Sequence, residues 1–195
     1  MLTGVPTGSD NSLITDTNIQ MLGMKGEDIV DDTCWIIKSH FPWVAEYAPQ
    51  FKTNKVLIIV RNPTESNLSW LNLVHTQNHV TKVPFVVNEE YPNFWEWWTK
   101  DCMGHMKNWY ETFMRDAREK SAPVLFVRFE DLVSNPEPEL YRMMKFLLGE
   151  TDLTGTNAER RIKEVIAKGA GATVTYQLKD TTRQFNRNAN FYTEE

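Results

Sequence analysis

Cysteine and long apolar runs are what this sequence has least of. Its two cysteines, Cys34 and Cys102, are too few for a disulfide framework and lack the spacing of zinc ligands. No stretch approaches the roughly 18 apolar residues that a membrane-spanning helix requires, and no charged-then-apolar signal begins the chain. These absences predict a soluble chain without a membrane segment, a disulfide scaffold or a zinc module.

The chain also has fewer positively charged than negatively charged side chains. The chain has 21 Lys and Arg against 26 Asp and Glu, which gives a formal net charge of −5 and a pI near 5.5. An acidic surface repels phosphate backbones and anionic lipids, so this balance argues against nucleic acid or a membrane surface as the main partner. Any anion site must therefore be a local positive pocket.

The apolar segments alternate between strand and helix patterns. The 195 residues suit one domain, and 41% hydrophobic residues can fill a sizeable core. Residues 1–33 read as mostly irregular and residues 76–92 as a long loop. Strands alternating with helices predict an α/β fold with a parallel sheet. The predicted strands cover residues 35–40, 55–60 and 123–129, and the helices residues 63–75, 93–119, 134–149 and 157–168.

The segment Lys55–Trp70, KVLIIVRNPTESNLSW, joins a strand pattern to a helix start. Its continuous aliphatic run is typical of a parallel strand covered on both faces, and Asn62-Pro63 suits a helix cap and first turn. Arg61 then stands at the carboxyl end of the strand, with Ser69 roughly 10 Å further along the helix. An arginine and a hydroxyl beside a helix N-terminus predict an anion site. The alternative is an ordinary strand–helix join whose arginine pairs with a surface carboxylate.

Polar groups also follow the other two predicted strands. Lys38 and His40 share one face of an extended segment. Such a pair suits group transfer, because histidine can accept a proton while lysine neutralises developing charge; the alternative is a structural histidine. Glu130-Asp131 follow the third strand, either as a catalytic carboxylate pair or as structural residues that cap a helix and pair with basic groups. Since parallel strands share one carboxyl edge, these groups are expected to meet Arg61.

Three segments together resemble one enzyme family. WIIKSHFP resembles the Lys-Thr-His-Leu-Pro element of sulfotransferases that use 3′-phosphoadenosine 5′-phosphosulfate (PAPS), and VRNPTESNLSW resembles their 3′-phosphate signature. PVLFVRFEDLVSNPEPELYRMMKFLLG resembles the strand-and-helix segment that follows their aromatic helix. The similarity covers most of residues 1–150 and, more weakly, 185–195. The best match is the branch in which sulfotransferase domains accompany a WSC domain.

This resemblance implies roles for individual residues. His40 would be the general base, and Lys38 would assist at the sulfuryl group. Arg61 and Ser69 would hold the 3′-phosphate of the co-substrate PAPS, with no metal required. Phe129 stands where many cytosolic members have a tyrosine near the nucleotide. Arg187 would be the local counterpart of a late Arg-Lys-Gly element.

The resemblance also implies a fold and a missing part. The family's fold is a three-layer parallel sheet flanked by helices, of the P-loop nucleotide-binding type. The first strand and the 5′-phosphosulfate loop would lie before residue 1, so residues 1–195 are interpreted as a single, incomplete sulfotransferase-like domain. The acceptor would be a hydroxyl-bearing small molecule, carbohydrate or protein, in the cytoplasm or the Golgi lumen.

Two other functions remain as alternatives. The first is a degenerate, non-catalytic relative that binds a nucleotide, sugar or protein partner. The second is a P-loop kinase relative, which is disfavoured because no magnesium ligands occur at kinase spacing. The aromatic helix around residues 94–113 is interpreted as core rather than as a sugar platform. His75 and His79 have the spacing of a zinc helix but lack the glutamate of His-Glu-x-x-His, so a metal site there is disfavoured.

Overall fold

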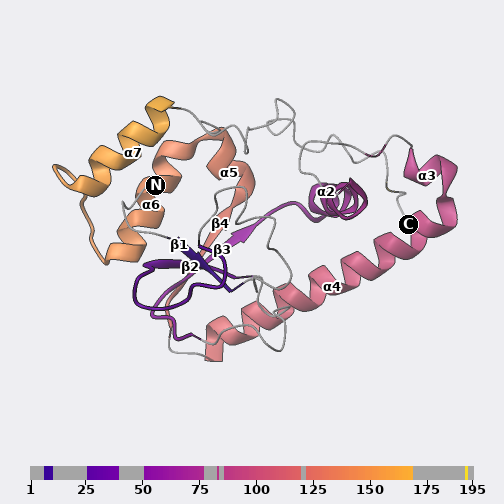
Figure 1. Cartoon of the computed structure of the whole chain (residues 1–195), viewed down its shortest axis with the longest axis horizontal. Coiled ribbons are helices and arrows are strands. Elements are labelled where there is room, and N and C mark those ends of the chain that lie inside the picture. Colours follow the sequence, from indigo (N-terminus) through magenta and orange to yellow (C-terminus); the bar gives the residue numbers. More distant parts are fainter. Residues whose placement is uncertain are drawn as a thin grey trace. The chain divides into compact units, whose positions relative to one another are not determined.

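The computed structural model describes residues 7–10, 26–39, 51–76, 83, 86–119, 122–168 and 192. The chain divides into two compact units. The first unit consists of Met1–Lys55 and Leu140–Gln177, and the second consists of Val56–Glu139 and Leu178–Glu195. Each unit has a two-stranded parallel sheet and an apolar core of its own (Figure 1).

The sheet of the first unit pairs β1 (Thr7–Ser9) with β2 (Ile36–Lys38) in parallel. The backbone N–H of Ser9 also donates to the carbonyl of Ile29 at 3.2 Å. Gly8 lies so close to this carbonyl that a Cβ would stand 1.9 Å from the Ile29 oxygen. Position 8 therefore requires glycine, because any other residue would place its Cβ against the Ile29 carbonyl. The strand pattern around β2 is confirmed, whereas β1 lies in a segment that the sequence predicted to be irregular.

The core of the first unit lies between α6 (Pro136–Leu148), from Leu140 onward, and α7 (Asn157–Lys168). Its side chains are aliphatic or thioether, which pack without polar atoms to satisfy. Both helices match the sequence prediction closely. The buried members of this core are Met144, Leu153 and Ile162.

Hydrogen bonds at the C-terminal end of α6 explain where this helix ends. Gly149 adopts a φ of 75°, and its N–H donates to the Lys145 carbonyl at 2.9 Å, so α6 ends on a left-handed glycine. The ammonium of Lys55 binds the carbonyls of Phe146 at 2.7 Å and Leu147 at 3.1 Å. A cation at this end also complements the helix dipole.

The sheet of the second unit pairs β3 (Val56–Val60) with β4 (Val124–Arg128) in parallel. Ile58 is 3% exposed, but its neighbour Ile59 is 50% exposed. The expectation of a strand covered on both faces is therefore wrong. The helix α5 (Phe129–Ser134) follows β4 directly, and the Ile59 side chain stays half exposed.

The described strands thus form two small parallel sheets among helices, and a mixed α/β protein is confirmed. The single, three-layer P-loop sheet stays a prediction, as does the single incomplete domain over residues 1–195. The third strand ends one residue earlier than predicted. Phe129 begins α5 instead of closing the strand.

Three helices build the core of the second unit: α2 (Pro63–Thr76), α3 (Val87–Glu90) and α4 (Pro92–Glu119). Figure 1 shows α2 end-on and α4 lengthwise, so their axes cross steeply. The short helix α3 lies inside the stretch predicted as a loop. None of the described helices has the length and apolar character to cross a membrane. The buried members of this core are Leu71, Val87, Trp95 and Trp98, with Leu68, Phe94, Cys102 and Tyr192 packed against them.

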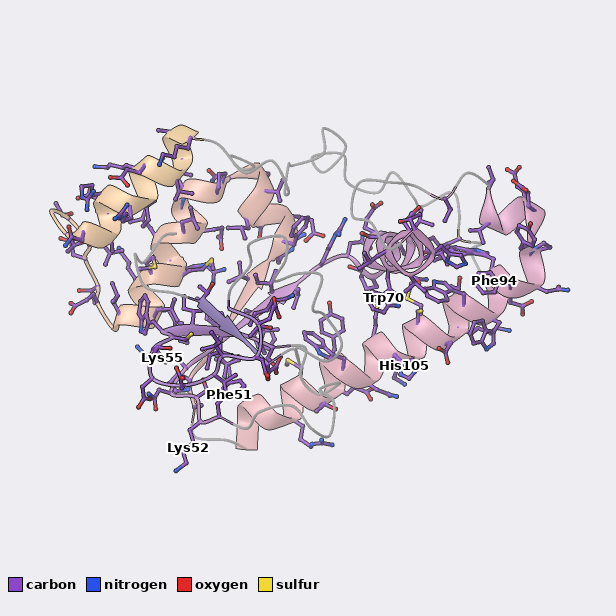
Figure 2. The ribbon with its side chains drawn as sticks, viewed as in Figure 1. Phe51, Lys52, Lys55, Trp70, Phe94 and His105 are labelled. Carbon is purple, nitrogen blue, oxygen red and sulfur yellow. The ribbon has the colours of Figure 1, made fainter. Side chains whose placement is uncertain are left out.

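The aromatic stretch of α4 is divided between core and surface. Trp95 and Trp98 are 8% and 9% exposed, which confirms the interpretation of this stretch as core. Trp97 is 58% exposed on the same helix, and Trp70 is 52% exposed on α2. Figure 2 shows Trp70 on α2 and Phe94 on α4. An amphipathic helix explains this division, because residues three and four apart share its buried face.

Candidate functional site

The predicted site residues fall in both units. Lys38 ends β2 in the first unit and is exposed. Arg61 follows β3, Ser69 lies on α2, and Phe129 begins α5, all in the second unit. His40 and Arg187 lie outside the described residues. The described geometry therefore builds two part-sites, one around Arg61 and one around Lys38, and the meeting of all strand ends stays a prediction.

Arg61 stacks on the ring of Phe129. The central carbon of its guanidinium lies 4.7 Å from the ring centroid. The two residues follow β3 and β4 directly, and the parallel pairing of Val60 with Arg128 brings these strand ends together. Stacking occupies the flat face of the guanidinium, while its N–H donors point outward in the plane. Phe129 thus orients the donors of Arg61 without competing for them.

Asn62 caps the first turn of α2. Its Oδ1 accepts hydrogen bonds from the backbone N–H of Thr64 at 3.0 Å and from the Thr64 hydroxyl at 2.7 Å. The N–H of Ser66 donates to the Asn62 carbonyl at 3.0 Å and opens the helical series. The predicted cap is confirmed, and it fixes the angle at which the chain leaves Arg61.

Three side chains from other parts of the second unit hold the same turn. Glu130 accepts the backbone N–H of Asn62 through Oε1 at 2.8 Å. The hydroxyl of Tyr110 donates to the Arg61 carbonyl at 3.2 Å, and that of Tyr192 donates to the Thr64 carbonyl at 2.8 Å. Burial raises the pKa of Tyr110, and burial raises the pKa of Tyr192 to about 12. Both phenols therefore remain protonated donors at neutral pH.

Neither tyrosine was found by sequence reasoning. A phenol that donates to a distant backbone carbonyl leaves no pattern in the sequence. Glu130 was singled out, and its structural interpretation is supported, since it binds the Asn62 N–H. Its neighbour Asp131 lies 3.5 Å from Arg128 as a surface ion pair. The two carboxylates are thus engaged separately and do not form a pair.

Ser69 is exposed on α2 and shares a face with Asn62 and Ser66, because the three are spaced i, i+4 and i+7. This face begins at the capped N-terminus, where the helix dipole favours an anion. The buried carboxylate of Glu65 also lies in the first turn and is 5% exposed. Positive charge for an anion must therefore come mainly from Arg61.

The end of β2 is held by a residue that sequence reasoning missed. The backbone N–H of Asp10 donates to the Lys38 carbonyl at 3.1 Å, and the Ser39 hydroxyl donates to Oδ2 of Asp10. Asp10 is 4% exposed. Only the pairing of β1 with β2 brings it to this position, and β1 has no alternation of apolar residues that could have predicted it.

The histidine pair considered for a zinc helix is described only in part. Among the described residues, no three His, Cys, Asp or Glu side chains are grouped so that they could hold a metal ion. His75 instead contacts the Leu71 carbonyl through Nδ1 at 3.1 Å and packs edge-to-face on Phe94, with ring centroids 5.8 Å apart. His79 lies outside the described residues.

Comparisons with known proteins agree with the motifs. The sulfotransferase domain family matches residues 20–169 of this chain. A WSCD family member of the mosquito Aedes aegypti is 26% identical over 146 residues, which cover 74% of this chain and 43% of that protein. The chain therefore spans less than half the length of this curated relative, and no solved structure matches it significantly. Because the family match covers most of the chain, the chain belongs to the sulfotransferase domain family.

Proposed function

We propose that this chain is the body of a sulfotransferase that transfers a sulfuryl group from PAPS to the hydroxyl of an acceptor. The observation that carries this proposal is the oriented guanidinium of Arg61, stacked on Phe129 beside the capped N-terminus of α2. It stands at the carboxyl end of a parallel strand, where α/β proteins bind their ligands.

The donor would be held by its 3′-phosphate. Arg61 supplies charge and a planar fork of donors that matches phosphate oxygens. The exposed hydroxyl of Ser69 adds a neutral donor on the helix that follows Arg61. Arg187 is proposed as a further basic group for the nucleotide.

The transfer itself would use Lys38 and His40. His40 accepts the proton of the acceptor hydroxyl as the hydroxyl oxygen attacks sulfur, and a new O–S bond forms. The bond between sulfur and the bridging phosphate oxygen breaks, and 3′-phosphoadenosine 5′-phosphate leaves with that electron pair. The Lys38 ammonium offsets the negative charge that develops during this step. The acceptor is a hydroxyl-bearing small molecule, carbohydrate or protein.

Nucleotide affinity tests the binding half of the proposal. In the full-length protein that contains this chain, Arg61→Ala should weaken 3′-phosphoadenosine 5′-phosphate by about thirtyfold, or about 2 kcal/mol, as for a charge-assisted contact. Isothermal titration calorimetry measures this change. Arg128→Ala is the matched control, because Arg128 lies opposite Val60 on the paired strand and contacts Asp131 at the surface. Equal affinities of the Arg61 variant and the parent would remove Arg61 from the site.

Transfer from radiolabelled PAPS tests the catalytic half. We expect His40→Ala to lower the rate by roughly 10²–10⁴-fold while nucleotide affinity stays the same. A parent protein that binds the nucleotide but transfers nothing to a panel of acceptors would instead favour the non-catalytic alternative.

A further inference from the structure

The residues that follow β1 and β2 are joined through Asp10 in two ways. Its backbone N–H binds the carbonyl of Lys38 at 3.1 Å, and its carboxylate accepts the hydroxyl of Ser39. The main chain of Asp10 thus contacts the last residue of β2, and its side chain contacts the residue that follows β2. All three belong to the first unit.

The burial of this carboxylate is costly for an ordinary structural contact. Asp10 is 4% exposed, and no donor among the described residues reaches its Oδ1. A buried carboxylate requires partners to offset the loss of hydration, and an asparagine or serine would join the strands at lower cost. What distinguishes Asp10 from the other nearly buried carboxylate of this unit, Glu27, is its contact with the end of β2.

The element that Asp10 contacts would be mobile without it. β2 has three residues, and its partner β1 also has three, so the ladder between them supplies few hydrogen bonds. Lys38 ends this short strand and carries a long, exposed side chain. A reacting group is effective only if it is held within about an ångström of its place.

We propose that Asp10 is a positioning residue for sulfuryl transfer: by binding the Lys38 carbonyl and the Ser39 hydroxyl, it sets where the Lys38 ammonium stands. This proposal rests on the proposed function. Asp10 itself touches neither donor nor acceptor.

Kinetics of the full-length protein provide the first test. Ser39→Ala removes the hydroxyl and should lower kcat by about tenfold or more, while KM for PAPS stays within about twofold, since the donor's 3′-phosphate is bound elsewhere. Ser39→Thr keeps a hydroxyl and should restore kcat. Asp10→Asn, which keeps an acceptor but loses the charge, should lower kcat and displace the pH–rate profile.

The control is Glu27→Gln. Glu27 is also a nearly buried carboxylate of the first unit, at 8% exposure, and within the described residues no hydrogen bond joins it to β2. We expect kcat to be unchanged in this variant. Equal losses in the Glu27 and Ser39 variants, or a failure of threonine to restore kcat, would overturn the positioning role.

The second test does not depend on transfer. The rate at which acetic anhydride modifies Lys38, followed by peptide mass spectrometry, should change by about threefold or more in Ser39→Ala, because the loosened strand end no longer holds the exposed amine in one environment. Lys52 is the internal reference; Figure 2 shows its side chain extending away from the strands. An unchanged ratio of Lys38 to Lys52 modification would overturn the proposal even if the parent is active. A changed ratio in a protein without transfer activity would retain the contact and reject the proposed function instead.

Discussion

The two strand ends that carry the proposed site are held in different ways. After β3, the turn through Arg61 and Asn62 is contacted from α4 by Tyr110, from α5 by Glu130 and Phe129, and by Tyr192 near the end of the chain. At the end of β2, the ladder pairs Lys38 with Ser9, and Asp10 contacts both Lys38 and Ser39. The group proposed to bind an anion is thus held by side chains from several elements, whereas the end of β2 is held by its short ladder with β1 and by Asp10.

This difference in the number of contacts affects how single substitutions should behave, because one substitution removes only one of several contacts. Loss of one contact at the Arg61 turn leaves the others in place, so each single variant should have a partial effect. Loss of the Ser39–Asp10 contact leaves the strand end with its backbone pairing to β1 and Asp10, so a single variant should have a larger effect there. The following predictions test whether the Arg61 turn is as redundant as its contacts suggest, in order of decreasing effect.

Glu130→Ala should have the largest effect on stability. It leaves the Asn62 N–H without its carboxylate acceptor, a charge-assisted bond that costs about 2 kcal/mol of unfolding free energy when lost. Urea denaturation followed by circular dichroism measures it. Asp131→Ala is the control, because its ion pair with Arg128 is exposed and contributes about 0.5 kcal/mol at most. Equal destabilisation in both variants would contradict the structural role of Glu130.

Tyr192→Phe should cost about 1 kcal/mol at neutral pH, since it deletes the hydrogen bond to the Thr64 carbonyl. The folded protein holds the phenol proton more tightly than the unfolded chain, because burial raises the pKa of Tyr192 to about 12. The stability from this group is therefore complete below about pH 10 and is lost as the pH rises towards 12.

Urea midpoints at about pH 9 and about pH 11 measure this dependence. The parent should lose more stability between the two than Tyr192→Phe does. The pKa of Tyr110 is raised in the same direction by burial, so part of the dependence should remain in the variant. Identical pH dependence in parent and variant would exclude Tyr192 as its source.

Phe129→Ala should produce the smallest effect, a loss in nucleotide affinity of about fivefold, or about 1 kcal/mol, as expected for one partly exposed cation–π contact. Phe129→Tyr retains the ring and should retain the affinity. Calorimetric titration with 3′-phosphoadenosine 5′-phosphate gives both values. If the alanine variant lost as much affinity as Arg61→Ala, the turn would depend on Phe129 and the proposed redundancy would be wrong.

Local signals in the sequence predicted the helices well. Asn62-Pro63 located the start of α2, and Gly149 located the end of α6, because caps are decided by the residues that form them. α7 likewise has the bounds that were predicted for it, residues 157–168. These elements needed no knowledge of distant parts of the chain.

Contacts between distant segments were not predictable in the same way. β1 is a strand only because β2 lies beside it, and Asp10 reaches Lys38 only through that pairing. The exposure of Ile59 was not predicted, because an aliphatic run shows that a strand could be buried on both faces but not which elements cover it. For the candidate site, the sequence predicted Arg61 and the helix cap at Asn62, but it did not predict the contact of Tyr110 with the Arg61 carbonyl.

Gly8 has a consequence for the alignment of the two strands. A strand as short and polar as β1 has no apolar face to prevent it from sliding along β2 by one residue. A slip in either direction would bring a residue with a Cβ, Thr7 or Ser9, against the Ile29 carbonyl, where the space at Gly8 leaves only 1.9 Å for such an atom. The absence of a side chain at Gly8 therefore restricts β1 to one register against β2. That register also determines which residue of β1 pairs with Lys38.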